Sequence, residues 1–184
     1  MKKILLRILP RLLPAGALFL PLGSLTISLG ALFERPTSYN LVGLLKTFGG
    51  KGNELFLNLL KSEAMAPAVP WLVLSIVGLV LGVLAVLAGL ALSWRGSIKL
   101  YAASAAVYAG GTLGIALAAA AFPLFGKILV EAVSLASTAL GYGVWILLAL
   151  LLLNAAVCFF QWRAEKEQAR LAALAKRQKQ KRKR

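Results

Sequence analysis

Residues 68–94, AVPWLVLSIVGLVLGVLAVLAGLALSW, form one apolar run that contains no Asp, Glu, Lys, Arg or His. Two more runs without such residues follow, at positions 100–125 and 139–162. Each run exceeds the roughly 20 apolar residues that a helix needs to cross a hydrocarbon core about 30 Å thick. A fourth, less regular candidate lies at residues 12–33. The sequence therefore predicts an all-α membrane protein with four transmembrane helices.

The composition of the whole chain leads to the same class. Of its 184 residues, 60% are hydrophobic, and the mean hydropathy is +0.82. A water-soluble domain of this length needs more polar surface, so lipid must solvate much of the outside. We expect one transmembrane domain over residues 1–162, with its last three spans at about 68–94, 99–122 and 139–162, followed by a basic tail over residues 163–184.

The positions of Lys and Arg predict the orientation. Sixteen of the 21 basic residues lie before the first span, between the second and third spans, or after the fourth span. Five lie in the two remaining loops. Because basic loops stay on the cytoplasmic side, we expect both termini in the cytoplasm and a multi-pass protein of the cytoplasmic membrane.

The first span permits two descriptions. Residues 24–29 alternate polar and apolar side chains, which is the period of a strand rather than of a helix. Three prolines precede them and each removes a helical hydrogen-bond donor: Pro10, Pro14 and Pro21. The less favoured description is a continuous helix over residues 12–33, in which the alternation is accidental.

In the favoured description, a helix covers about residues 5–24 and the chain turns into a short extracytoplasmic strand after Leu22, because an open strand is not tolerated in hydrocarbon. Arg7 and Arg11 then snorkel, one turn apart, to the cytoplasmic headgroups. A cleaved signal peptide is disfavoured, since Arg7, Pro10 and Arg11 interrupt the continuous apolar run that such a peptide requires.

The two extracytoplasmic loops predict interfacial helices. Residues 41–48 and 55–60 carry apolar side chains at helical spacing, and a potential capping residue precedes each segment. Short amphipathic helices beside a bilayer usually lie on its surface. The same interpretation covers the second loop, residues 126–138.

Stripes of small residues predict where the helices touch. In the second span these are Ser75, Gly78, Gly82, Ala85 and Gly89, and in the third span they are Ala106, Gly110, Gly114 and Ala118. Lipid is as apolar as leucine, so helices in a membrane associate through close van der Waals packing at such residues. We expect both stripes to form helix contacts and the third span to be the central helix.

Asn154 lies about two turns from the cytoplasmic end of the fourth span. Hydrogen bonds of such groups in a membrane contribute roughly 0.6–2 kcal/mol. We therefore expect Asn154 to stabilise the bundle or its contact with a neighbouring subunit rather than to bind a substrate. Apart from Arg7 and Arg11, which are expected to snorkel, the interiors of the predicted spans hold no charged side chain to coordinate ions or relay protons, and this weakens the interpretation as a channel.

The residue types argue against an enzyme. The chain has no histidine, which removes His-based metal ligation and His-activated nucleophiles. Its carboxylates are scattered, and no Gly-rich phosphate loop follows a strand. Cys158 is the single cysteine and is expected to be a small packing residue. We predict no catalytic residue, no metal site and no cofactor.

The basic tail, residues 163–184, is the second feature of the sequence that points to a specific structure and partner. Residues 163–175 have helix-forming composition and are expected to extend the fourth helix into the cytoplasm. The last nine residues are expected to form a disordered polycation held at anionic lipid headgroups. Its basic residues are Lys176, Arg177, Lys179, Lys181, Arg182, Lys183 and Arg184. Binding to nucleic acid or to the ribosome is the less favoured alternative.

Four segments carry a resemblance to known membrane proteins: Phe19-Leu20-Pro21, the alternating residues 24–29, residues 39–45 and residues 141–145. The chain resembles small bacterial four-helix membrane proteins and, more distantly, the claudin-type tetraspan topology. Claudins carry a cysteine pair and a Trp-based motif in their first outer loop, and this chain has no cysteine there. The resemblance therefore implies a topology and not paracellular adhesion.

Together these observations predict a non-enzymatic membrane protein that acts as an assembly, scaffold or accessory subunit. Its expected partners are anionic lipids and either other membrane subunits or further copies of itself. The alternative is a subunit of a small oligomeric channel or transporter.

Overall fold

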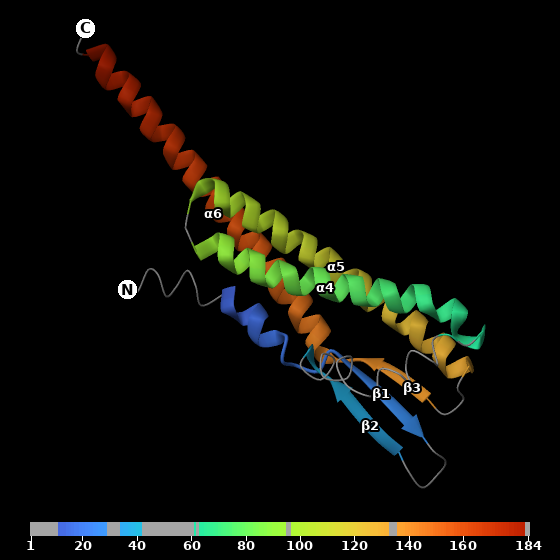
Figure 1. The fold of residues 1–184 in the computed structure, drawn as a ribbon. Helices are drawn as coiled ribbons and strands as arrows, with labels where there is room; N and C mark the ends of the chain where they lie inside the picture. Colours follow the sequence, from blue (N-terminus) through green and yellow to red (C-terminus); the bar gives the residue numbers. More distant parts are fainter. Residues whose placement is uncertain are drawn as a thin grey trace.

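Three long helices dominate the computed structural model, which describes residues 11–28, 34–41, 61, 63–94, 97–132 and 136–182 (Figure 1). They are α4 (Val69–Trp94), α5 (Ile98–Ala132) and α6 (Tyr142–Arg182). The 3-10 helix η1 (Glu63–Ala68) leads into α4, and residues 11–17 are helical. By length and composition, three helices can each cross a membrane, as expected for a multi-pass membrane protein.

The helix boundaries agree closely with the predicted second span and less closely with the next two. α4 begins one residue later than predicted and ends at Trp94 as predicted. The third span, predicted to end at residue 122, lies within a longer helix, since α5 passes through Pro123 and continues to Ala132. The fourth span is predicted to start at about residue 139, and α6 begins three residues later, at Tyr142.

A three-stranded sheet explains the late start of α6. β1 (Gly23–Ser28) lies between β2 (Glu34–Tyr39) and β3 (Ala136–Leu140), and both neighbours run antiparallel to it. The strand predicted after Leu22 is thus confirmed, and the continuous helix over residues 12–33 is wrong. A single strand would leave its backbone donors and acceptors without partners, and pairing on both sides satisfies them.

The helical interpretation of residues 126–138 is correct only in its first half. α5 covers this segment up to Ala132, whereas residues 136–138 belong to β3. The interfacial helices predicted over residues 41–48 and 55–60 lie outside the described residues, except for Leu41.

The core lies where four parts of the chain meet: α4, α5, α6 and residues 11–22, which we call the first segment. Its largest buried apolar members include Val86, Tyr108, Ile115, Leu147 and Leu151. A smaller cluster joins η1 and the start of α4 to the last third of α5, and it consists of Met65, Ala68, Leu72, Phe125 and Leu129. Because α5 contacts α4, α6, β3 and η1, it is the central helix of the bundle.

The two ends of the bundle differ in character. The sheet lies at one end, and the last part of α6 projects alone beyond the opposite end, where α4 connects to α5 (Figure 1). The prediction that residues 176–182 are disordered is wrong, since α6 remains helical to Arg182. Residues 163–182 contain no Gly or Pro and are rich in Ala, Leu, Lys, Arg and Gln, which favour a helix.

Candidate helix-packing site

The small-residue stripe of α4 faces α5 along its whole length. All five of its residues are buried: Ser75, Gly78, Gly82, Ala85 and Gly89. At Gly78 the neighbours are backbone atoms, because a Cβ atom there would overlap the Gly114 carbonyl oxygen and lie 2.9 Å from the Ala118 nitrogen. The stripe therefore brings the two backbones into direct contact.

The glycines closer to the end of α4 meet side chains instead of backbone. A Cβ atom at Gly82 would overlap the end of the Ile115 side chain. A Cβ atom at Gly89 would lie 2.5 Å from Cζ of the Tyr108 ring, which is itself fully buried. The glycine thus makes room for a buried aromatic ring between α4 and α5.

On α5 the structure brings only half of the predicted stripe to α4. Gly114 and Ala118 form part of the interface, and Gly111 and Tyr108 join them without having been predicted. Gly111 packs against Ala85. The glycine pair at positions 110 and 111 could have indicated this contact from the sequence. The spacing alone did not identify which of the two glycines faces α4.

Ala106 and Gly110 lie on a different side of α5. Both are exposed, and a Cβ atom at Gly110 would have no atom within 4 Å. The reason is geometric: each step of four residues turns about 40° around a helix of 3.6 residues per turn. Positions 106 and 118 therefore lie about 120° apart, so a four-residue ladder winds from one face to another.

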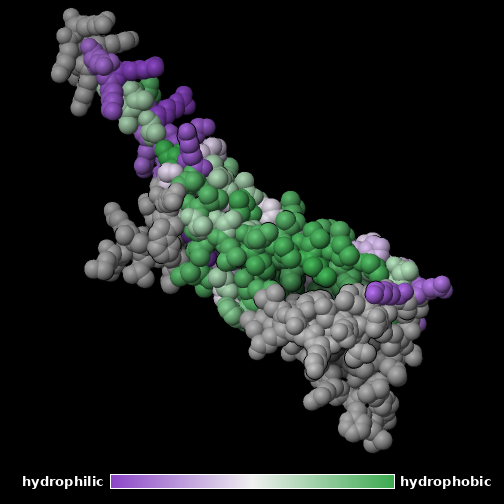
Figure 2. Space-filling view, viewed as in Figure 1, coloured by the Kyte–Doolittle hydropathy of each residue, from purple (hydrophilic) through white to green (hydrophobic). Residues whose placement is uncertain are grey.

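This second side of α5 carries mostly small residues. We call it the open α5 face, and its exposed residues are Ala106, Ala109, Gly110, Leu113, Ala116, Leu117 and Ala120. Leu113 is 73% exposed and projects between smaller neighbours. Figure 2 shows the continuous apolar surface of the helical region on the side in view, with polar surface along the projecting end of α6 and a smaller polar patch at the opposite end of the helices.

Buried polar groups in the spans bond to carbonyl groups of their own helices. Asn154 is 1% exposed, and its Nδ2 donates a hydrogen bond to the Leu150 carbonyl at 2.9 Å. The hydroxyls of Ser75, Ser104 and Thr112 likewise donate to carbonyls four residues earlier. This bonding lowers the cost of placing polar atoms in an apolar bundle.

We predict that Asn154→Leu lowers thermal stability by about 1 kcal/mol, because it removes the hydrogen bond from Asn154 Nδ2 and changes the side chain at a fully packed position. Thermal unfolding in mild detergent measures this loss, with the half-exposed Leu153→Ala as control. Unchanged stability together with altered ion flux in reconstituted vesicles would contradict a structural role and favour a channel.

Arg11 forms a buried polar cluster that the sequence did not predict. Its Nη2 donates to Gln161 Oε1 at 2.6 Å, and its guanidinium carbon lies 5.4 Å from the centroid of the Tyr101 ring. Cys158 is buried beside it. Arg11 is 2% exposed, so the predicted snorkelling of Arg11 to the headgroups is wrong, whereas Arg7 lies outside the described residues. The first segment, α5 and α6 enclose the side chain before it reaches the surface.

The opposite end of the first segment is tied to the start of α6. The backbone N–H of Gly141 donates to the Leu22 carbonyl at 3.0 Å, and that of Gly143 donates to the Pro21 carbonyl at 2.9 Å. A Cβ atom at Gly141 would overlap the Pro21 carbonyl oxygen. The first segment is thereby fixed at both ends of the same stretch of α6.

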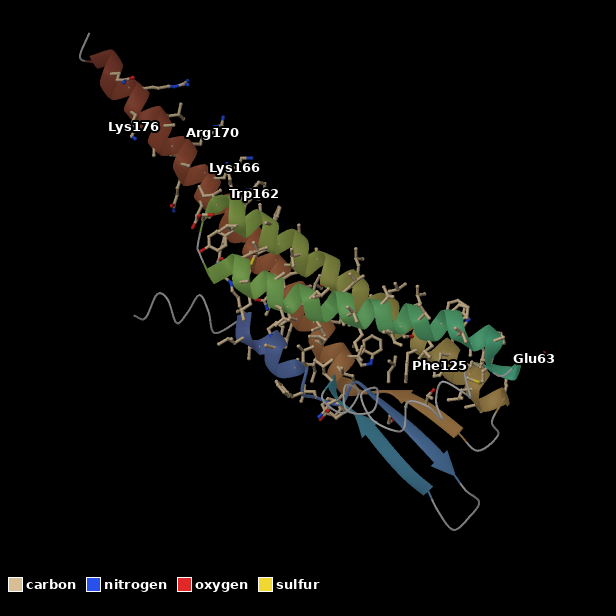
Figure 3. All side chains as sticks on the ribbon, in the orientation of Figure 1. Glu63, Phe125, Trp162, Lys166, Arg170 and Lys176 are labelled. Carbon is tan, nitrogen blue, oxygen red and sulfur yellow. The ribbon has the colours of Figure 1, made fainter. Side chains whose placement is uncertain are left out.

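The basic residues of the tail lie on the projecting part of α6. Lys176 and Arg177 are exposed, and Lys166 places its Nζ 4.9 Å from the centroid of the Trp162 ring (Figure 3). The helical backbone continues through positions 179, 181 and 182, whereas Lys183 and Arg184 lie outside the described residues. Figure 3 shows Lys166, Arg170 and Lys176 on this isolated helix.

Within the described ranges, no group of three or more His, Cys, Asp and Glu side chains is arranged to hold a metal ion. No family model matches the chain, and no curated protein and no solved structure matches it significantly. Arguments about function therefore depend on the geometry of this chain itself.

Proposed function

We propose that this protein is a non-enzymatic scaffold or accessory subunit of the cytoplasmic membrane that docks a partner transmembrane helix on the open α5 face. The observation that carries the proposal is that three sides of α5 have different surroundings. One side packs on α4 through Gly111, Gly114 and Ala118, and α6 packs on another. A third side presents small residues to the surroundings.

Small residues on a lipid-facing side gain little from lipid contact but allow close approach of another helix. A second copy of this chain is the simplest partner, because the same face is then available on both molecules and closes a two-fold interface. The absence of charged residues on this face suits contact within the hydrocarbon region.

We further propose four membrane crossings, with both termini on the cytoplasmic side. Helix α6 rises about 30 Å between Gly141 and Gln161, which matches the hydrocarbon thickness. The first segment contacts both ends of this stretch, through Arg11 and through Pro21 and Leu22. Its course alongside α6 supports a crossing by the first segment in addition to the three long helices.

Aromatic side chains support the same limits for the α6 span. Tyr142 and Trp145 are exposed at its start, and Trp162 lies at its other end. Such residues are enriched at the two membrane–water interfaces. The excess of Lys and Arg after Trp162 then favours the cytoplasm for the projecting part of α6.

The test is the oligomeric mass of the purified protein in mild detergent. Gly110→Leu should reduce the mass to that of a monomer while thermal stability stays within about 1 kcal/mol, since Leu is a good helix former and the site is open. Ala88→Leu on the exposed side of α4 is the matched control and should leave the mass unchanged. A monomeric wild type, or an oligomer that persists in Gly110→Leu, would contradict the proposal.

A further inference from the structure

The projecting part of α6 is an isolated basic helix. Every described side chain from Arg163 to Gln180 is exposed except that of Glu165, which is partly exposed. Residues 163–182 contain eight Lys and Arg against two Glu. A helix that packs on no other described part of the chain and carries this excess of one charge needs a function other than core formation.

Part of the charge is concentrated on one side of this helix. At 100° per residue, Arg163, Lys166, Arg170 and Arg177 fall within an arc of about 60°. Neither Glu165 nor Glu167 falls within that arc, and all four basic side chains are exposed. The backbone thus presents a basic stripe about 21 Å long.

The geometry separates most of this charge from the lipid headgroups. If Trp162 marks the membrane interface, Lys176 stands about 21 Å and Arg182 about 30 Å farther along the helix axis. A tilt of 40°, which is the upper end of the usual range, still leaves Lys176 about 16 Å from that level. Attraction to anionic headgroups decays over a Debye length of about 8 Å at physiological salt. The far half of the helix therefore faces the aqueous phase rather than the bilayer.

The spacing of the charges fits a polyphosphate. The four residues of the basic stripe give one positive charge per ~7 Å, about twice the 3.4 Å between successive phosphates on one DNA strand, so that each can meet a phosphate of the same strand. Helices of this kind bind phosphate backbones through charge without reading bases. We propose that the projecting part of α6 binds the phosphate backbone of nucleic acid in the cytoplasm, independently of sequence.

The test uses the full chain in nanodiscs of zwitterionic lipid and a fluorescent RNA duplex of mixed sequence, followed by anisotropy. Contact with four phosphates gives a slope of log affinity against log salt of about −3.6, or roughly 150-fold weaker binding from 50 to 200 mM salt. Replacing Lys166, Arg170 and all seven basic residues from Lys176 to Arg184 by Gln, which preserves helix propensity, should weaken binding at least 100-fold at 50 mM salt.

The control variant carries Leu171→Ala and Leu174→Ala and should bind within threefold of the wild type, because these exposed apolar side chains contribute no charge. Equal RNA binding by the wild type and the Gln variant would overturn the proposal. So would a probe at Gln178→Cys, in a Cys158→Ser background, that becomes shielded from water in anionic but not in zwitterionic nanodiscs, because the helix would then lie on lipid. Gly110→Leu should leave RNA binding unchanged, which separates this proposal from the docking role of α5.

Discussion

Gly78→Leu should destabilise the bundle more than any other single exchange in the α4 stripe. A Cβ atom at Gly78 would meet the backbone of Gly114 and Ala118, and a backbone cannot move aside without shifting α5. Overpacking of a well-packed core typically costs about 1–3 kcal/mol, and a branched side chain against backbone should reach or exceed the upper end. Thermal unfolding in detergent measures the loss.

Two further variants provide stability losses with which the loss at Gly78 can be compared. Gly82→Leu should cost less, because its Cβ atom meets the flexible end of Ile115. Leu81→Ala should cost least of the three, since Leu81 is about half exposed and alanine keeps the Cβ atom that lies beside Gly114. Equal losses for the three variants would show that the stripe is not the contact face.

Gly141→Ala is expected to detach the first segment from α6. The added methyl group would overlap the Pro21 carbonyl oxygen, and the two backbone hydrogen bonds at Pro21 and Leu22 would be lost as the chain moves away. We expect a loss of about 2–3 kcal/mol, from overpacking together with the unmade bonds. Thermal unfolding and protease cleavage near residue 22 both report this change.

Gly16→Ala is the control for the same exchange in the same segment. Gly16 lies in the helical residues 11–17, and a Cβ atom there would meet nothing within 4 Å. Alanine is better than glycine in a helix by up to about 1 kcal/mol, so this variant should be neutral or stabilised. A loss at Gly16 equal to that at Gly141 would contradict the importance of the Pro21 contact.

Local patterns in the sequence predicted the elements that depend on local chemistry. The charge-free run at residues 68–94 predicted α4 to within one residue at its start. The alternation at residues 24–29 predicted β1. In both cases the period of the side chains is the physical cause of the structure and can be read directly.

The features that were missed depend on contacts between distant segments. β3 forms because β1 offers it an edge more than 100 residues earlier, and Arg11 is buried because Gln161 and Tyr101 enclose it. The ladder on α5 was predicted as one contact face, although helix geometry turns it through about 120°. The helix at residues 176–182 was missed because charge was weighed above the helix propensity of Lys, Arg and Gln.

The central claim is that the sheet and the basic end of α6 lie on opposite sides of a membrane crossed four times. Single cysteines at Lys2, Glu63 and Gln178, in a Cys158→Ser background, can be labelled with a membrane-impermeant maleimide in intact cells. We predict that Glu63→Cys is labelled in intact cells, and that Lys2→Cys and Gln178→Cys are labelled only after permeabilisation. Labelling of Lys2→Cys in intact cells together with Glu63→Cys would leave three crossings and would contradict the account.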